Sequence, residues 1–382
     1  MQAPNVDLLD ELIPDDQQED ESDLNDKDIS FKDAVVMNAD WTIETINGQV
    51  NKGNIDLDPG FQRRSAWDNV RQSRLIESLI VSLPIPNIVL AENKTSRGRF
   101  LVIDGKQRLL TLNSFMADKL VLKGLDIRKD LNGRTYSTLD VEDREFLENS
   151  TLRSTVIKNW SDENFLFIMF FRLNSGSLPL SPQELRKALI GGKVLNAIEE
   201  YISQSVSFHR IFGEVPDKRM RDSELVLRFI AFDMSFEAYN GNLKDFLDNA
   251  TKLFEGDWDN QQAVLNNALT RLDLALDTSF EIFGSNSFKK WLGDNYERRI
   301  NRAIFDCITR YFADKDVSKA ALNDPTAVTQ AFQDICLDTR FKESIEKTTK
   351  SVGATNTRLS MWGQELAGRL SLKFDDASFR VV

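Results

Sequence analysis

The stretch Arg99-Phe100-Leu101-Val102-Ile103-Asp104-Gly105-Lys106-Gln107-Arg108-Leu109 decides the fold of the first part of the chain. Its beginning is an apolar run of the kind that forms a buried strand, and Asp104-Gly105 is a turn signal. Apolar residues then recur at helical spacing at Leu109, Leu112 and Met116. The pattern predicts a strand that ends in a tight turn and leads directly into a helix.

The residues before this corner predict a helix and a hairpin. Over residues 70–83 one apolar stripe has helical spacing, and Pro84-Ile85-Pro86 ends the helix. The stripe consists of Leu75, Ile76, Leu79, Ile80 and Leu83. Asn87-Ile88-Val89-Leu90 is predicted to be a strand that pairs with 99–103, so 87–103 is expected to form a β-hairpin.

The spacing of apolar residues changes after about residue 120, and helical periodicity dominates residues 140–382. Helices are expected at 184–190, 223–236, 243–254, 262–276, 296–312 and 326–335. The fold class is therefore α+β. A small α/β domain over residues 31–130 is expected to precede a larger, mostly α-helical domain over 131–382, which can divide into two sub-bundles near residue 240.

Composition and charge indicate the class of protein and its compartment. The chain has 382 residues and a net charge of −12, but residues 1–30 hold 11 acidic residues and one Lys, which leaves −2 for the rest. Such an acidic segment is predicted to be a disordered tail. The longest apolar run, residues 165–171, is far shorter than the roughly 20 residues of a membrane span. With no signal-peptide pattern and two Cys, a soluble cytoplasmic protein is expected.

A single His excludes several chemistries. His209 alone cannot build an HNH nuclease or a zinc site with two His ligands, and we interpret it as a packed or surface side chain. Cys307 and Cys336 are too few for a four-cysteine zinc site, and both lie in helical pattern, so they are interpreted as buried apolar residues.

The strand-to-helix corner at residues 104–108 is a candidate phosphate site, and the residues alone leave two interpretations open. The first turn of a helix presents unpaired N–H groups at the positive end of the dipole. Gly105 would let a ligand approach the backbone, and Lys106 and Arg108 add positive charge. Asp104 can cap the helix or hold Mg²⁺ against a phosphate. The alternative is a capped helix with solvated Lys and Arg side chains.

Three ordered segments resemble one family. They are Asp58-Pro59-Gly60-Phe61-Gln62-Arg63-Arg64 with Trp67, then Val102-Ile103-Asp104-Gly105-Lys106-Gln107-Arg108-Leu109, then Phe170-Phe171-Arg172-Leu173-Asn174-Ser175-Gly176 with Leu180-Ser181 and Glu184-Leu185-Arg186. This arrangement resembles the N-terminal domain of GmrSD-type restriction endonucleases, in the ParB/sulfiredoxin-like superfamily. Lys106 stands where the family's Asp-Gly-Gln-Gln-Arg motif has its first Gln.

The resemblance implies a nucleotide-binding, and often nucleotide-hydrolysing, module of a prokaryotic restriction or anti-phage system. It implies catalytic roles for Asp104 and Arg108 and a possible Mg²⁺ at Asp104. A nucleoside triphosphate of unknown base would be bound by Gln62, Arg63, Gly105, Lys106, Gln107 and Arg108. Supporting or ligand-facing positions would be Glu77, Arg172, Asn174, Ser175, Gly176 and Arg186.

Partners and alternatives follow from the same resemblance. DNA, a separate nuclease subunit and a second copy of the chain are candidate partners, and a membrane is not. Two other hypotheses stay open at this point. One is a non-catalytic DNA-, nucleotide- or protein-binding module, and the other is an adaptor that uses the acidic tail as its contact. Sulfiredoxin chemistry is disfavoured because neither Cys lies near the 104–108 turn.

Overall fold

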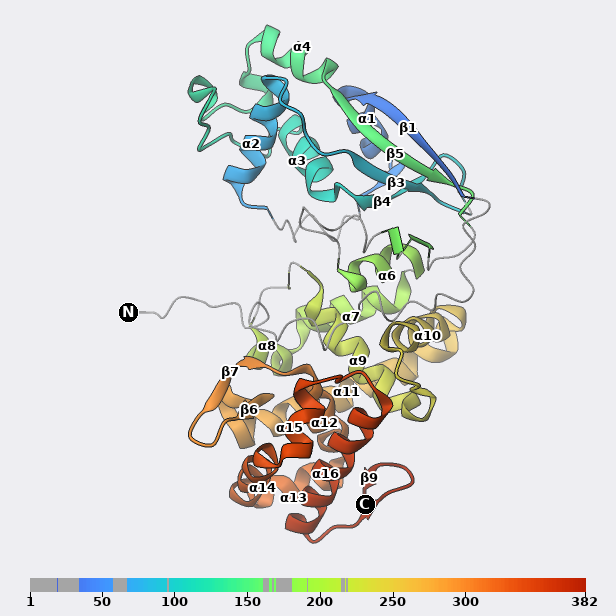
Figure 1. Ribbon diagram of the computed structural model, residues 1–382, viewed down its shortest axis with the longest axis vertical. Helices are drawn as coiled ribbons and strands as arrows, with labels where there is room; N and C mark the ends of the chain where they lie inside the picture. Colours follow the sequence, from blue (N-terminus) through green and yellow to red (C-terminus); the bar gives the residue numbers. More distant parts are fainter. Residues whose placement is uncertain are drawn as a thin grey trace. The chain divides into compact units, whose positions relative to one another are not determined.

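The structure is a computed structural model that describes residues 19, 34–57, 67–94, 96–160, 165–166, 168–169, 181–190, 192–213, 217 and 219–382 (Figure 1). The chain divides after residue 189 into two compact units, an N-terminal one that contains the sheet and a helical C-terminal one. The predicted fold class is confirmed: a small α/β region precedes a mostly helical one. Most of the predicted acidic tail, residues 1–18 and 20–30, lies outside the described residues.

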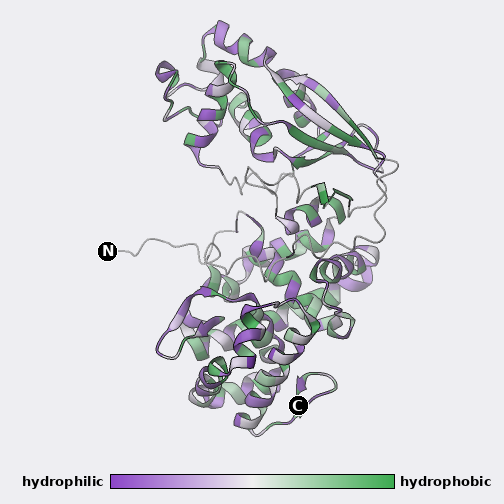
Figure 2. Cartoon of the chain, viewed as in Figure 1, coloured by the Kyte–Doolittle hydropathy of each residue, from purple (hydrophilic) through white to green (hydrophobic). Residues whose placement is uncertain are grey.

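The N-terminal unit is built on a five-stranded mixed sheet with the strand order β1-β5-β3-β4-β2. The strands are β1 (Val35–Thr42), β2 (Ile55–Asp56), β3 (Ile88–Glu92), β4 (Phe100–Asp104) and β5 (Thr151–Lys158). The inner strands β3 and β4 are antiparallel, which confirms the predicted hairpin. They consist mostly of hydrophobic residues, as their colour shows in Figure 2.

Both faces of this sheet are covered, because alternate residues of one strand enter different cores. Ile88 and Leu90 pack with the helices on one face, whereas Val89 and Ala91 pack on the other face with the segment around Trp160. The helices of the first face are α1 (Ile43–Asn51), α2 (Asn69–Ile80), α3 (Lys106–Met116) and α4 (Val141–Asn149). Such two-sided burial explains the continuous apolar runs of β3 and β4.

The sheet extends beyond residue 130, where the sequence placed the end of the first domain. Strand β5 runs to Lys158, pairs antiparallel with β1 and pairs parallel with β3. Its residues Leu152 and Val156 are buried, but Ser154, between them, is buried as well and interrupts the apolar pattern. Because Ser154 interrupts the apolar pattern, helical periodicity was expected over a segment that forms an inner strand of the sheet.

Helix α2 ends earlier than its apolar stripe predicted. The helix stops at Ile80, and Ser82 adopts a left-handed φ of +59°. Leu83 therefore leaves the stripe, and 46% of its surface is exposed. Trp67, before the start of α2, is partly buried and packs against the core that α2 and α3 share.

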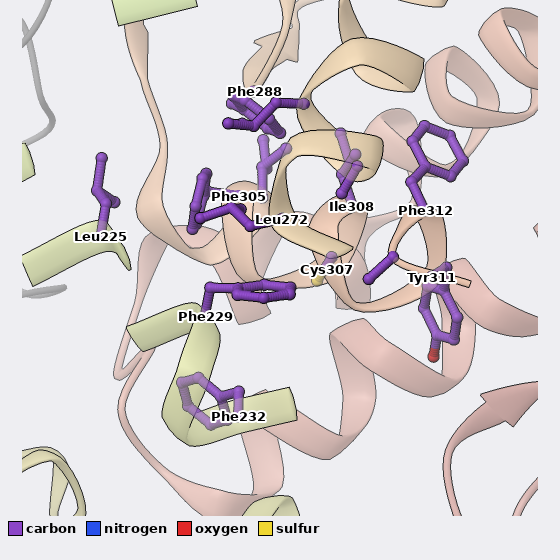
Figure 3. Packing of buried hydrophobic residues seen from close by; sticks show 14 of the residues in the cluster. Leu225, Phe229, Phe232, Leu272, Phe288, Phe305, Cys307, Ile308, Tyr311 and Phe312 are labelled. Atoms are coloured by element: carbon purple, nitrogen blue, oxygen red, sulfur yellow. The ribbon is translucent and has the colours of Figure 1, made fainter. Parts of the chain in front are cut away.

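The C-terminal unit packs its helices around one large core. Figure 3 shows Phe229, Leu272 and Phe305 gathered near Cys307 in this core. The rings of Phe288 and Phe305 make an edge-to-face contact, with their centroids 5.0 Å apart. The core contains residues before and after 240, so the described part of the unit has one continuous core across the predicted break. Its helices are α7 (Lys193–Gln204), α8 (Val206–Phe212), α9 (Arg221–Ser235), α10 (Leu243–Gly256), α11 (Trp258–Phe283), α12 (Arg302–Phe312), α13 (Lys315–Asn323), α14 (Pro325–Leu337), α15 (Thr339–Glu346) and α16 (Val352–Leu370).

The first part of one predicted helix is a strand in the structure. The helix expected over 296–312 is preceded by β7 (Tyr296–Ile300), which pairs with β6 (Lys289–Trp291). Asn301 separates the two elements: its side chain accepts a hydrogen bond from the N–H of Ile304 and caps α12. An Asn that caps a helix marks its first turn, so Asn301 is the residue in the sequence that indicates where α12 begins.

A short hairpin, β8 (Phe374–Asp375) with β9 (Arg380–Val381), packs on α16. Buried Arg310 donates to the backbone carbonyls of Phe232, Ser378 and Phe379, which ties this hairpin to α9 and α12. Across the described residues, no helix is long and apolar enough to span a membrane.

Candidate functional site

The predicted corner is present, and Gly105 is its pivot. Strand β4 ends at Asp104, Gly105 has φ +95° at the N-cap position, and α3 starts at Lys106. A Cβ on Gly105 would lie 2.5 Å from Cγ2 of Ile88, so this side of the backbone is filled by the protein itself. The glycine is therefore required by its left-handed conformation and by packing, and its predicted contact with a ligand stays a prediction.

Arg108 is a buried member of this corner rather than a solvated side chain. Its residue is 3% exposed, and Nη2 donates to Oδ2 of Asp104 at 2.8 Å and to the carbonyl oxygen of Asn87 at 2.9 Å. Nε is buried and has no hydrogen-bond partner among the described residues. The alternative with solvated Lys and Arg side chains is therefore wrong for Arg108, whereas its phosphate contact stays a prediction.

Asp104 had two predicted roles, as a helix cap or as a metal ligand. Gly105 occupies the N-cap position, and the carboxylate of Asp104 pairs with Arg108. Its side chain is 17% exposed. The described residues contain no group of three or more His, Cys, Asp or Glu side chains that could hold a metal. Mg²⁺ commonly binds one or two carboxylates together with substrate phosphates, so Asp104 fits that ion only with a bound nucleotide.

The first turn of α3 suits an anion. It contains Lys106, Gln107 and Arg108 and no acidic residue. Lys106 is 9% exposed, and the carbonyl of Gln107 accepts a hydrogen bond from the hydroxyl of Thr111, one turn later. Helix-dipole and side-chain charge therefore have the same sign at this end.

Glu77, a predicted supporting position, is a buried residue of α2 and not an exposed helix charge. Its Oε1 accepts from the N–H groups of Ile127 and Arg128 at 2.9 and 2.7 Å. Glu77 therefore fixes the connection between α3 and α4. The cause of its burial lies 50 residues away in the chain and could not be read from the α2 pattern.

Several predicted positions lie outside the described residues: Gln62, Arg63, Arg172, Asn174, Ser175 and Gly176. Arg186 is described. It lies on α6 (Pro182–Ile190), is fully buried and donates from Nη1 to Oε1 of Gln183 at 2.6 Å. A capping box begins α6, with reciprocal hydrogen bonds between Ser181 and Glu184.

The remaining candidates behave as structural residues. His209 is partly buried, and its Nε2 contacts the carbonyl oxygen of Ile202 at 2.5 Å. Burial raises the pKa of the Cys307 thiol to about 12, and burial also raises the pKa of the Cys336 thiol to about 12. Both thiols are therefore neutral and inert at ordinary pH, as their interpretation as apolar residues predicted.

Sequence reasoning missed Asn87. It was expected only to begin a strand, but its backbone carbonyl joins Arg108 to the end of the α2–β3 connection. This contact spans 21 positions and has no local sequence signal.

One family model matches the part of the chain that contains this corner. Residues 43–191 match the model of the GmrSD restriction endonuclease N-terminal domain. The resemblance deduced from the motifs is thereby confirmed. The GmrSD N-terminal-like region includes the whole 104–108 corner, α2 with Glu77 and α6 with Arg186, and it supports a place in a restriction system. Neither a curated protein nor a solved structure matches the chain.

Proposed function

We propose that this chain is the nucleotide-binding component of a restriction system directed against foreign or modified DNA, and that it hydrolyses a nucleoside triphosphate with the help of Mg²⁺. The observation that carries the proposal is the start of α3, where Gly105 precedes a first turn that contains Lys106 and Arg108 and no acid. Helix N-termini of this kind bind phosphate through backbone N–H groups. The match over residues 43–191 supports the restriction context.

The residues of the corner have separate tasks in this proposal. The N–H groups of the first turn and the Lys106 ammonium would orient and neutralise the phosphates. Arg108 would act from behind, because it holds both Asp104 and the carbonyl of Asn87. Phosphoryl transfer needs positioning and charge neutralisation more than a covalent nucleophile. Mg²⁺ would neutralise phosphate charge when bound, and the Asp104 carboxylate is the described residue at this corner that would hold it.

Thermal melting with each of the four nucleotides, with and without Mg²⁺, tests binding. A nucleotide at 100 times its dissociation constant should raise the free energy of unfolding by about 2.7 kcal/mol. Asp104→Asn keeps an oxygen acceptor for Arg108 and removes the negative charge. We expect this variant to lose the Mg²⁺-dependent part of the stabilisation and to retain the rest.

Phosphate release in the steady state tests hydrolysis. The matched control is Arg74→Ala, which breaks an exposed ion pair with Asp126 on the same unit. Hydrolysis by the wild-type chain and by this control, together with a loss in Asp104→Asn, would support the enzyme. Background rates with all four nucleotides in the wild type would end the enzyme proposal.

A second function, nucleotide or DNA binding without hydrolysis, is favoured by one observation: the two predicted catalytic side chains, Asp104 and Arg108, form an ion pair with each other. Salt separates the forms of this alternative. Binding to a DNA backbone weakens steeply between about 50 and 200 mM salt, whereas a nucleotide pocket would discriminate between bases. In either form we propose that a separate nuclease subunit cuts DNA, since the chain has a single His.

A further inference from the structure

A broad groove lies on the N-terminal unit, outside the 104–108 corner. Its volume is about 1120 Å³, and it is bounded by the connection after α2, by α4 and by the neighbouring parts of β1 and β5. Asn87, whose carbonyl accepts from Arg108, contributes to its wall. Every residue that lines it is described and belongs to the one unit that contains the sheet.

The groove exposes large apolar side chains. Leu83 and Phe146 are each 46% exposed and Val141 is 59% exposed, and all three line it. Leu83 is the residue that the early end of α2 removes from the core. On α4, by contrast, the buried residue is Leu147. Clustered exposed apolar groups of this size mark binding surfaces more often than isolated ones do.

The charges around these apolar groups are mainly negative. Glu142 and Glu145 lie on α4 and Asp40 lies on β1, while the positive charge of the lining is Arg153. Arg153 is directed to Asp40, with Nε 3.4 Å from Oδ1. Within the described part of the chain, neither Glu142 nor Glu145 forms an ion pair. The groove therefore repels phosphate and nucleic acid. It attracts a ligand that carries positive charges beside an apolar surface.

We propose that this groove docks a basic amphipathic helix of a partner protein. Apolar residues at helical spacing would contact Leu83, Val141 and Phe146, and Lys or Arg side chains beside them would meet Glu142 and Glu145. Helix-in-groove recognition combines apolar anchors with a charged rim in this way. The occupant is a protein segment, because the carboxylates oppose a polyanion. This docking does not depend on nucleotide hydrolysis.

The test uses the full chain and a fluorescent synthetic helix of about 18 residues, with Leu on one face and Lys on the other, in about 150 mM salt. We expect Phe146→Ser and Glu145→Lys each to raise its dissociation constant by about tenfold. The matched control is Glu44→Lys, which reverses an exposed carboxylate on α1 outside the groove. This control should leave the affinity within about twofold, because Glu44 does not line the groove and exposed charges are screened by salt.

Amide hydrogen exchange locates the bound peptide. Slower exchange over residues 82–87 and 141–153 would support the proposal. Absence of binding, protection elsewhere, an equal loss in Glu44→Lys, or equal binding of a peptide with Glu in place of Lys would overturn it. Protection of the same amides by duplex DNA instead of the peptide would also overturn it, since the surface would then be a nucleic-acid site. Unchanged melting temperatures of Phe146→Ser and Glu145→Lys would exclude misfolding as the cause of their weaker binding.

Discussion

Arg108 and Asp104 face each other across the strand-to-helix corner, with Nη2 and Oδ2 2.8 Å apart. The same nitrogen reaches the carbonyl of Asn87, so one guanidinium joins the end of β4, the start of α3 and the segment before β3. The charges at the candidate site thus also hold its backbone in place.

Replacing Arg108 should reduce stability more than replacing Asp104. Arg108→Ala leaves a partly buried carboxylate and the carbonyl of Asn87 without this donor, and loss of one partner of a buried pair costs about 3 kcal/mol. Asp104→Asn keeps an acceptor oxygen and should cost about 1 kcal/mol. Urea unfolding of both single variants and the double variant measures this. Costs that simply add would show that the two side chains are not coupled.

Gly105→Ala should be destabilising for two separable reasons. The left-handed conformation costs about 1–2 kcal/mol for an L-residue, and overlap with Ile88 adds about 1–3 kcal/mol. Gly98→Ala is the matched control, because Gly98 has φ +77° with open space around it and should show only the first cost. Equal losses of unfolding free energy for the two variants would mean that the Ile88 side chain moves aside at no measurable cost.

Glu77→Ala should loosen the connection between α3 and α4. The N–H groups of Ile127 and Arg128 would lose their buried acceptor, with a cost of about 2–3 kcal/mol, while Glu77→Gln retains an acceptor oxygen and should cost less. Hydrogen exchange of residues 125–129 is the measurement, and we expect faster exchange there in Glu77→Ala. If nucleotide binding falls with unchanged exchange, Glu77 acts at the ligand site instead.

Alkaline pH should destabilise the C-terminal unit through its buried thiols. Burial raises the pKa of Cys307 from 9.0 to about 12, so above pH 9 the folded state holds a proton that the unfolded state has released. This contribution is fully present below about pH 9 and is lost as pH rises towards 12, by at most about 1.4 kcal/mol per pH unit.

Cys307→Ala should therefore show a shallower loss of unfolding free energy between about pH 9 and 10.5 than the wild type. Ile308→Val, at the neighbouring buried position, is the control, because it should lower the free energy by a similar amount at every pH. Parallel pH profiles of Cys307→Ala and the wild type would contradict the assignment.

The local patterns predicted the corner well. Strand β4, the turn at Gly105 and helix α3 all follow from residues within one short stretch, and β3 pairs with β4 through a short connection. These elements are fixed by neighbouring residues, so periodicity and turn chemistry suffice.

Long-range contacts could not be predicted in the same way. The burial of Arg108 could not be predicted, because its partner carbonyl, at Asn87, is brought to it only by the sheet. The buried hydrogen bonds of Glu77 could not be predicted from the α2 pattern, because its partners come from the connection after α3. For β5, the buried Ser154 lowers the apolar signal of a strand whose position depends on both β1 and β3.

The position of β5 also sets an order of events during synthesis. Val35 of β1 faces Lys158 of β5, so β1 leaves the ribosome with its sheet neighbour still untranslated. At about 5–20 residues per second, β1 and its exposed Val36 and Met37 wait for several seconds before that neighbour emerges. During this interval the nascent chain exposes an unpaired strand edge that can pair with other chains. Chaperones that bind this edge, or slowly translated codons after residue 130, would therefore affect the yield of folded protein.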